Sequence, residues 1–99
     1  LNDQLRRTMS GGPVHMTDGI AALGLRDVHT IFEAVSKFSS FTADNDPWNE
    51  HDCAVMEVCG QRIIWKIDYY DRSRTYASPD AADPKLTVRV LTIMLASEY

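Results

Sequence analysis

Apolar and polar residues alternate on either side of Cys59-Gly60, a pattern that indicates the two strands of a β-hairpin. The predicted strands are 52–58 and 61–70, because an X-Gly pair is typical of a two-residue hairpin turn. In this register Glu57 faces Arg62, and cross-strand pairs of opposite charge stabilise a hairpin. One face is then uniformly apolar and carries Ala54, Met56, Val58, Ile63, Trp65, Ile67 and Tyr69. We expect that face to meet the core and the chemically mixed face to meet water.

Three other segments have the features of helices. In 26–38, apolar residues recur at intervals of three and four, which is one stripe of an amphipathic helix. Residues 1–9 fit a shorter helix, ended by a Ser-Gly-Gly-Pro sequence. The segment 84–98 opens with Asp83-Pro84, a cap followed by proline at the first helical position, and it carries a wide apolar stripe. It therefore also predicts a helix. A short edge strand is predicted at 14–16, directly after a proline.

Together these elements predict an α+β fold in a single domain, 1–99. Helices 1–9, 26–38 and 84–98 are expected to pack on one face of a small antiparallel sheet centred on the hairpin. The 99 residues are the size of one domain, and the composition, 44% apolar and 24% charged, is that of an ordinary globular protein. The last of these helices is so apolar that we expect it to be buried in the core or to pair with a second copy in a homodimer.

The net charge and the cysteines limit the expected class of ligand and the expected cellular compartment. The net charge of −4, from ten basic and fourteen acidic residues, argues against a general nucleic-acid binder, which usually has a basic face. Cys53 and Cys59 lie in one predicted strand, about 20 Å apart, too far for a disulfide. Free thiols favour a reducing compartment, and no apolar run is long enough to cross a membrane. Since the first residues also lack the features of a secretion signal, we expect a cytoplasmic protein without membrane association.

The segment from Asp44 to Asp52 is rich in carboxylates and contains no basic residue other than a histidine. Hard oxygen ligands suit calcium or magnesium, and a histidine suits zinc or manganese, so this loop is a candidate metal site. The candidate ligands are Asp44, Asp46, Glu50, His51 and Asp52. His51 is also a candidate general base, with Cys53 two residues further on, but no nucleophile motif accompanies it. The spacing does not match a calcium-binding loop, and a structured turn with Asp and Asn side chains bonded to backbone amides explains the composition without any ligand. No cofactor is expected.

The segment 66–74 mixes aromatic residues with both signs of charge, a composition typical of interaction surfaces. The candidate interface residues are Lys66, Asp68, Tyr70, Asp71, Arg72 and Arg74. An alternative is that Tyr70, Arg72 and Arg74 contact nucleic acid by stacking and phosphate contacts, although the neighbouring aspartates oppose this. A third interpretation is a plain strand with surface salt bridges, each worth less than about 1 kcal/mol.

Several uncommon short motifs occur along the chain. They are Asp44-Asn45-Asp46-Pro47, Glu50-His51-Asp52, Trp65-Lys66-Ile67-Asp68-Tyr69-Tyr70-Asp71, Ser78-Pro79-Asp80, Asp83-Pro84, Arg89 to Ala96, Glu98-Tyr99 and the opening Leu1-Asn2-Asp3 with Arg6-Arg7. In these motifs and their order, over nearly its whole length, the sequence resembles the proteobacterial domain-of-unknown-function family numbered 3768. One departure is Cys59-Gly60, where the family pattern has Asp-Gly. The resemblance implies a gene setting near plasmid or phage genes of alphaproteobacteria, with no agreed activity and no catalytic residue.

Three functions are compatible with these observations. The leading one is a non-enzymatic module that binds a protein partner, acting as an accessory or anti-defence (inhibitor-type) factor of a plasmid or phage; its gene setting, rather than its residue chemistry, suggests that role. The second is a metal- or His-dependent hydrolase at the Asp44–Asp52 loop. The third is a small nucleic-acid-binding regulator that uses Arg72 and Arg74.

Overall fold

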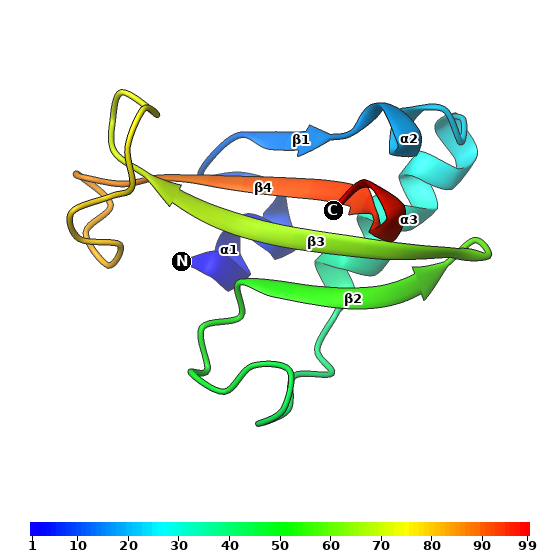
Figure 1. Ribbon diagram of the computed structural model, residues 1–99, viewed down its shortest axis with the longest axis horizontal. Helices are drawn as coiled ribbons and strands as arrows, with labels where there is room; N and C mark the ends of the chain where they lie inside the picture. The colour runs from blue at the N-terminus through cyan, green and yellow to red at the C-terminus, as the bar shows by residue number, and fades with distance from the viewer.

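The hairpin predicted from alternation forms the centre of a four-stranded sheet in the computed structural model, which describes residues 1–99 (Figure 1). Its strands are β2 (Cys53–Val58) and β3 (Gln61–Tyr70), and the predicted register is confirmed, with Glu57 opposite Arg62. Both turn residues have left-handed backbones, with φ of 55° at Cys59 and 74° at Gly60. This is the geometry of a type I′ turn, whose twist matches that of the strands it joins.

The sheet has the order β1-β4-β3-β2, so β1 and β2 are its edge strands and the last strand of the chain lies between β1 and β3. The edge strand β1 (Val14–Met16) is confirmed as a short strand after proline. It pairs in parallel with β4 (Val88–Leu95), while β3 pairs antiparallel with both β2 and β4. The sheet is therefore mixed, and the expectation of a purely antiparallel sheet is wrong at this edge.

The predicted helix 84–98 is also wrong: residues 88–95 are β4, followed by a short 3-10 helix, η1 (Ala96–Glu98). Asp83-Pro84 starts a turn, in which the amide of Leu86 donates to the carbonyl of Asp83, rather than a helix. The physical reason is that β4 is buried on both faces, with Leu91 and Ile93 on one side and Val90 and Met94 on the other. Such a strand reads as a continuous apolar run, rich here in β-branched residues, which periodicity alone cannot distinguish from a buried helix.

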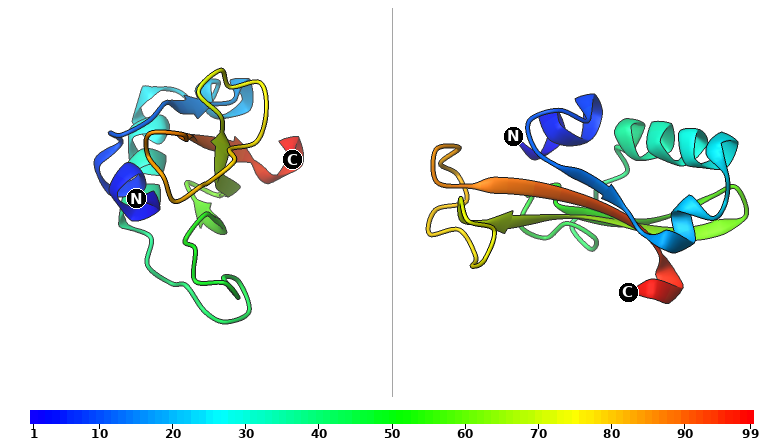
Figure 2. Two further views of the ribbon diagram at one scale, coloured as in Figure 1. Left: turned by 90° about the vertical axis from the view of Figure 1, so that its left-hand side faces the viewer. Right: turned by 90° about the horizontal axis from the view of Figure 1, so that it is seen from above.

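The helices α1 (Asn2–Thr8), α2 (Asp18–Ala21) and α3 (Leu25–Lys37) confirm the helices predicted at 1–9 and 26–38 and add a single turn. Figure 2 shows α1 and α3 on one face of the sheet, while η1 and the C-terminus lie on the other. The longest helix has 13 residues, and none could span a lipid bilayer.

The core lies between the sheet and the helices. It contains the inner side chains of β3 together with α1 and α3, and Trp65 is its largest member, with no exposed surface. Its buried members are Leu5, Ile20, Ile31, Val35, Ala54, Ile63, Trp65, Ile67, Leu91 and Ile93. The predicted division of the hairpin into an apolar inner face and a mixed outer face is thus confirmed. The α+β class is confirmed as well.

Candidate functional site

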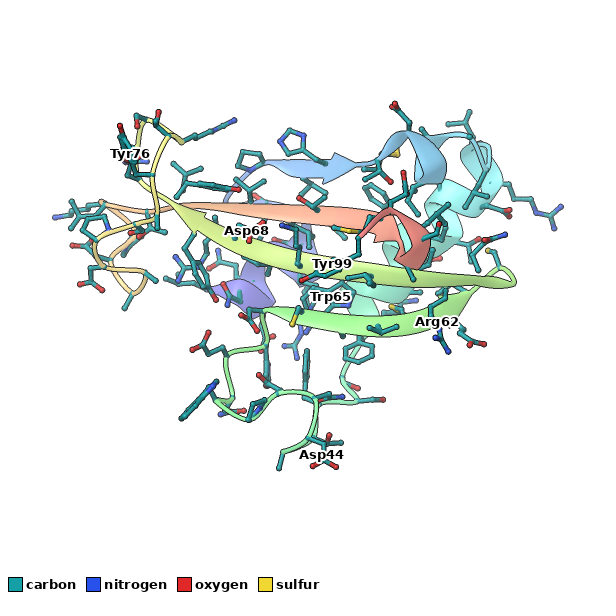
Figure 3. All side chains as sticks on the ribbon, in the orientation of Figure 1. Asp44, Arg62, Trp65, Asp68, Tyr76 and Tyr99 are labelled. Atoms are coloured by element: carbon teal, nitrogen blue, oxygen red, sulfur yellow. The ribbon has the colours of Figure 1, made fainter.

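The outer face of the sheet, opposite α1 and α3, is covered only by the short η1 helix and carries exposed apolar side chains. Val55 on β2 is 56% exposed and pairs with the half-buried Ile64 on β3. Tyr99, which follows η1, lies beside them and is 85% exposed (Figure 3). These side chains border a shallow hollow of about 450 Å³, whose floor also includes Lys66 and Asp68. An exposed apolar surface with a hollow of this kind suits the side chains of a binding partner.

Two of the candidate interface residues neutralise each other on this face. Lys66 Nζ donates to Asp68 Oδ2 at 2.6 Å, because residues two apart on a strand point to the same side. This hydrogen bond raises the pKa of Lys66. Tyr70 follows on the same face and is half-buried, with a bridge from its backbone to Ala77. The hollow therefore has an apolar wall and a paired, charge-neutral floor.

The edge of β2 next to this hollow is open. Since Cys59 and Gly60 form a two-residue turn, Val58 and Gln61 are a hydrogen-bonded pair, and such pairs alternate along an antiparallel ladder. A bond from the Ile67 amide to the Asp52 carbonyl confirms this alternation. The backbone N–H and C=O groups of Val55, and of its neighbours Cys53 and Glu57, consequently point away from β3.

The acidic loop folds around His51 rather than around a cluster of oxygen ligands. Nδ1 of His51 lies 2.9 Å from Asp3 Oδ1, and Nε2 lies 3.5 Å from Asp46 Oδ2. The imidazole stacks on Phe41, with ring centroids 3.9 Å apart and planes inclined by 3°. Asp46 is buried and accepts the amides of both Glu50 and His51, as the structured-turn interpretation expects. Both imidazole nitrogens therefore have a carboxylate neighbour from within the protein.

Asp3 joins this loop to the buried Arg6. Burial favours a raised pKa for Asp3, but its hydrogen bonds with His51 and Arg6 outweigh burial, and the pKa lies below its ordinary value. Asp3 is therefore ionised at neutral pH. Because an ionised carboxylate can only accept, His51 Nδ1 carries the proton that it donates to Asp3.

Arg6 is completely buried and completes the C-terminal end of α3. Its Nη1 donates to the carbonyls of Val35, Ser36 and Phe38, at 3.0, 3.2 and 2.6 Å, and its Nη2 donates to Asp3. The Val35 carbonyl also accepts the amide of Phe38, whereas the carbonyls of Ser36 and Phe38 accept no backbone amide. A cation at this end also complements the helix dipole. The guanidinium lies against the rings of Phe41 and Trp65, at 5.4 and 5.3 Å from their centroids. No sequence pattern indicates this residue, apart from a charged side chain one turn after Asp3.

The five candidate metal ligands do not converge. Asp46 and His51 approach each other, but Asp44 lies at the exposed tip of the 39–52 loop (Figure 3), and Glu50 is exposed. The structure contains no group of three or more His, Cys, Asp or Glu side chains arranged to hold a metal ion. Asp52 lies instead beside Cys53, where burial, followed by the charge and hydrogen bond of Asp52, raises the pKa of the thiol. This cysteine is therefore a thiol and not a reactive thiolate at neutral pH.

The remaining candidate interface residues lie at another part of the surface. Asp71 accepts bonds from the Ser73 hydroxyl and the Thr75 amide, and the first of these lowers the pKa of Asp71. Its carboxylate thus stabilises the turn after β3. Arg72 and Arg74 extend from this turn toward the α1–β1 connection, where they line a different hollow. The predicted interface 66–74 is therefore divided between two surfaces.

Asn2 and Arg89 also organise this end of the molecule, and the sequence analysis did not single them out. Asn2 Nδ2 donates to the Glu50 carbonyl and to the Tyr69 hydroxyl, and Asn2 Oδ1 accepts from Arg89 Nε at 2.9 Å. The Arg89 guanidinium also lies 5.2 Å from the Tyr69 ring centroid. A lone arginine within an apolar strand is the one sequence signal that indicates such a role.

Comparisons with known proteins give a family and no activity. Searches of curated proteins and of solved structures each return no match for this chain. A family model described as "Protein of unknown function (DUF3768)" matches residues 16–98, which begin at the last residue of β1 and include the acidic loop, the hairpin and β4. The chain therefore belongs to the DUF3768 family.

Proposed function

We propose that this protein is a non-enzymatic binding module that holds an extended, basic segment of a partner protein along β2. The observation that carries the proposal is the combination of an open strand edge and an adjoining apolar hollow on the face of the sheet opposite α1 and α3. Extended peptides bind such edges by adding a strand, with main-chain hydrogen bonds for affinity and pockets for specificity.

The backbone of β2 supplies the hydrogen bonds that this proposal needs. The outward-pointing groups of Cys53, Val55 and Glu57 provide alternating donors and acceptors, and no backbone bond outside the hairpin ladder uses them. Natural proteins usually protect a free edge with lysine, proline or a bulge. The strand Cys53–Val58 has no lysine and no proline, and its pairing with β3 runs without interruption.

The side chains beside this edge select the chemistry of the partner. Val55, Ile64 and Tyr99 offer apolar contact, with the Lys66–Asp68 pair adding no net charge. Carboxylates flank the strand, with Glu50 and Asp52 before it and Glu57 within it. The one arginine opposite, Arg62, is engaged with Glu57 at 3.7 Å. Alternating basic and apolar residues in the partner strand would match this arrangement.

The family setting suggests a more specific role for such a module. An acidic module that covers a basic surface could act as an inhibitor of a nucleic-acid-handling complex, such as a host defence system. This role rests on analogy of setting, and the binding mode rests on the residues above.

The test uses a display library of extended peptides, with amide hydrogen exchange as the structural readout. Peptides that alternate basic and apolar residues are expected to be enriched, and they should slow exchange at the amides of Cys53, Val55 and Glu57. The variants Val55→Lys and Glu57→Lys should weaken binding by about tenfold or more. Their stability should change by less than about 0.5 kcal/mol, because both side chains are exposed.

Glu33→Lys is the matched control for Glu57→Lys, because it makes the same charge change on the exposed face of α3. It should leave peptide binding within about twofold of the unaltered protein. Enrichment of acidic peptides, or protection of α3 in place of β2, would contradict the proposal. Protection of the same amides by self-association, without peptide, would assign the edge to a second copy and also overturn it.

A further inference from the structure

A second hollow, of about 420 Å³, lies at the other end of β3 and β4, where the turn after β3 approaches the α1–β1 connection (Figure 2). Arg72, Arg74 and Arg89 all line it, together with Gly11 and Gly12. No carboxylate is among its lining residues. A hollow lined by three arginines and no carboxylate is unusual in a chain whose net charge is −4.

Two of these arginines have no counter-charge. Neither Arg72 nor Arg74 makes a side-chain hydrogen bond or a salt bridge with any group of the protein, and both are exposed. The closest carboxylate in the sequence, Asp71, is occupied by Ser73 and Thr75. Asp68, the other carboxylate expected to oppose phosphate binding here, is paired with Lys66 instead.

The third arginine is held in place. Arg89 Nε donates to Asn2 and Nη2 donates to the Ala81 carbonyl, while the guanidinium lies over Tyr69. Nη1 has no hydrogen-bond partner in the protein. The partners of Arg89, which are Asn2, Tyr69 and Ala81, line a third hollow, which also includes Asp3 and Glu50. The free guanidinium groups of the arginine-lined hollow are therefore those of Arg72 and Arg74.

The α1–β1 connection adds backbone donors to the same hollow. The amides of Ser10, Gly11 and Gly12 donate no hydrogen bond within the protein. Gly11 has φ of 101°, which favours glycine, and Gly12 lies so close to the Arg89 carbonyl that a Cβ atom there would be 2.1 Å from its oxygen. Successive free amides beside a left-handed residue are the kind of backbone concavity that binds anions.

We propose that this hollow is a phosphate-binding site, taking a phosphate group carried either by a small nucleotide-sized ligand or by the backbone of a nucleic-acid strand. Guanidinium groups bind phosphate through paired N–H donors, and the volume is within the range of small-ligand pockets. The site is separate from the β2 edge, and it does not depend on the peptide-binding function proposed above.

The experiment titrates the protein with inorganic phosphate, with a nucleoside monophosphate and with a short single-stranded oligonucleotide, each at constant ionic strength. Amide chemical shifts of Gly11 and Gly12 and side-chain Nε–H shifts of the arginines are followed by NMR. All three probes share the phosphate group, so saturable shifts at Gly11 and Gly12 and at the side chains of Arg72 and Arg74 are expected. Tighter binding of the nucleotide than of the oligonucleotide identifies a small ligand, and the reverse order with a steep salt dependence identifies a nucleic-acid backbone.

The variants Arg72→Gln and Arg74→Gln should each weaken binding of the tightest probe by about fivefold to tenfold. Arg26→Gln, the same charge change on α3, is the control and should have less than about a twofold effect. Equal losses in all three variants would show that only net charge matters and would overturn the proposal. The absence of saturable shifts at Gly11 and Gly12 with every probe would also overturn it.

Discussion

Two groups of charged residues in this protein are used in opposite ways. Around His51, the buried and half-buried polar side chains have partners within the protein: Arg6 donates to Asp3 and to three carbonyls, and the imidazole of His51 lies between Asp3 and Asp46. Around Gly11 and Gly12, Arg72 and Arg74 have none. The first group joins segments that are distant in sequence, since Asp3 and His51 are 48 residues apart. The difference teaches that charge at the first group maintains the fold, whereas charge at the second is available to a ligand.

The largest effect that would sharpen this comparison is expected at Arg6. Arg6→Met should lower the free energy of unfolding by about 3 kcal/mol or more, because it removes the buried donor to the Ser36 and Phe38 carbonyls at the end of α3 and one of the two partners of Asp3. Arg6→Lys should recover only part of the loss, since a single ammonium cannot bind the α3 carbonyls and Asp3 in the way that the two ends of a guanidinium do. Urea unfolding of the three proteins measures both. A loss below about 1 kcal/mol for Arg6→Met would mean that this charge does not maintain the fold.

Sequence reasoning succeeded where the determining interactions are local. The hairpin is specified by alternation, by a turn that requires positive φ and by the Glu57–Arg62 pair, all within about twenty residues. The helix α3 is likewise visible in its own spacing. At β4 the local signal is ambiguous, because the side chains on both faces of the strand are buried. The alternation of apolar and polar residues that would identify a strand is therefore missing.

The site residues show the same limit. The acidic loop was recognisable from composition, and the interpretation as a structured turn agrees with the bonds of Asp46. The partners of His51 were not predictable, because Asp3 reaches it only after α1 packs beside the loop. The open edge of β2 also depends on strand order, which no local pattern contains.

The next largest effect concerns Asp3 and its pH dependence. Asp3→Asn should destabilise the protein at pH 7 by about 1 kcal/mol, a modest value because the carboxylate is partly exposed. The pKa of Asp3 is lowered in the folded state, so its stabilising effect is present above the unfolded value, near 4, and is lost as pH falls through the folded value. The difference in melting temperature between the two proteins should therefore narrow below about pH 4. A difference that stays constant from pH 7 to pH 2 would exclude ionisation as its cause.

A smaller effect is expected for the exposed pair Glu57–Arg62 on the hairpin. Its closest atoms are 3.7 Å apart, and both side chains are more than half exposed. A double-mutant cycle with Glu57→Gln and Arg62→Gln should give a coupling of about 0.3 kcal/mol, falling further in high salt. A coupling above about 1 kcal/mol would show that surface charge can stabilise this fold as much as the network around His51 does.

The smallest effect on stability is expected at the second charged group itself. Arg72→Gln and Arg74→Gln, singly and together, should change the free energy of unfolding by less than about 0.5 kcal/mol, because neither side chain is buried or bonded. Guanidinium groups that stabilise the turn after β3 would instead produce a loss comparable to that of Asp3→Asn, and would contradict the comparison. The same proteins serve for the phosphate titrations, so unchanged unfolding together with weakened binding would separate a ligand site from a structural one. Such a result would place the two functions of charge, holding the fold and binding a ligand, in different regions of the chain.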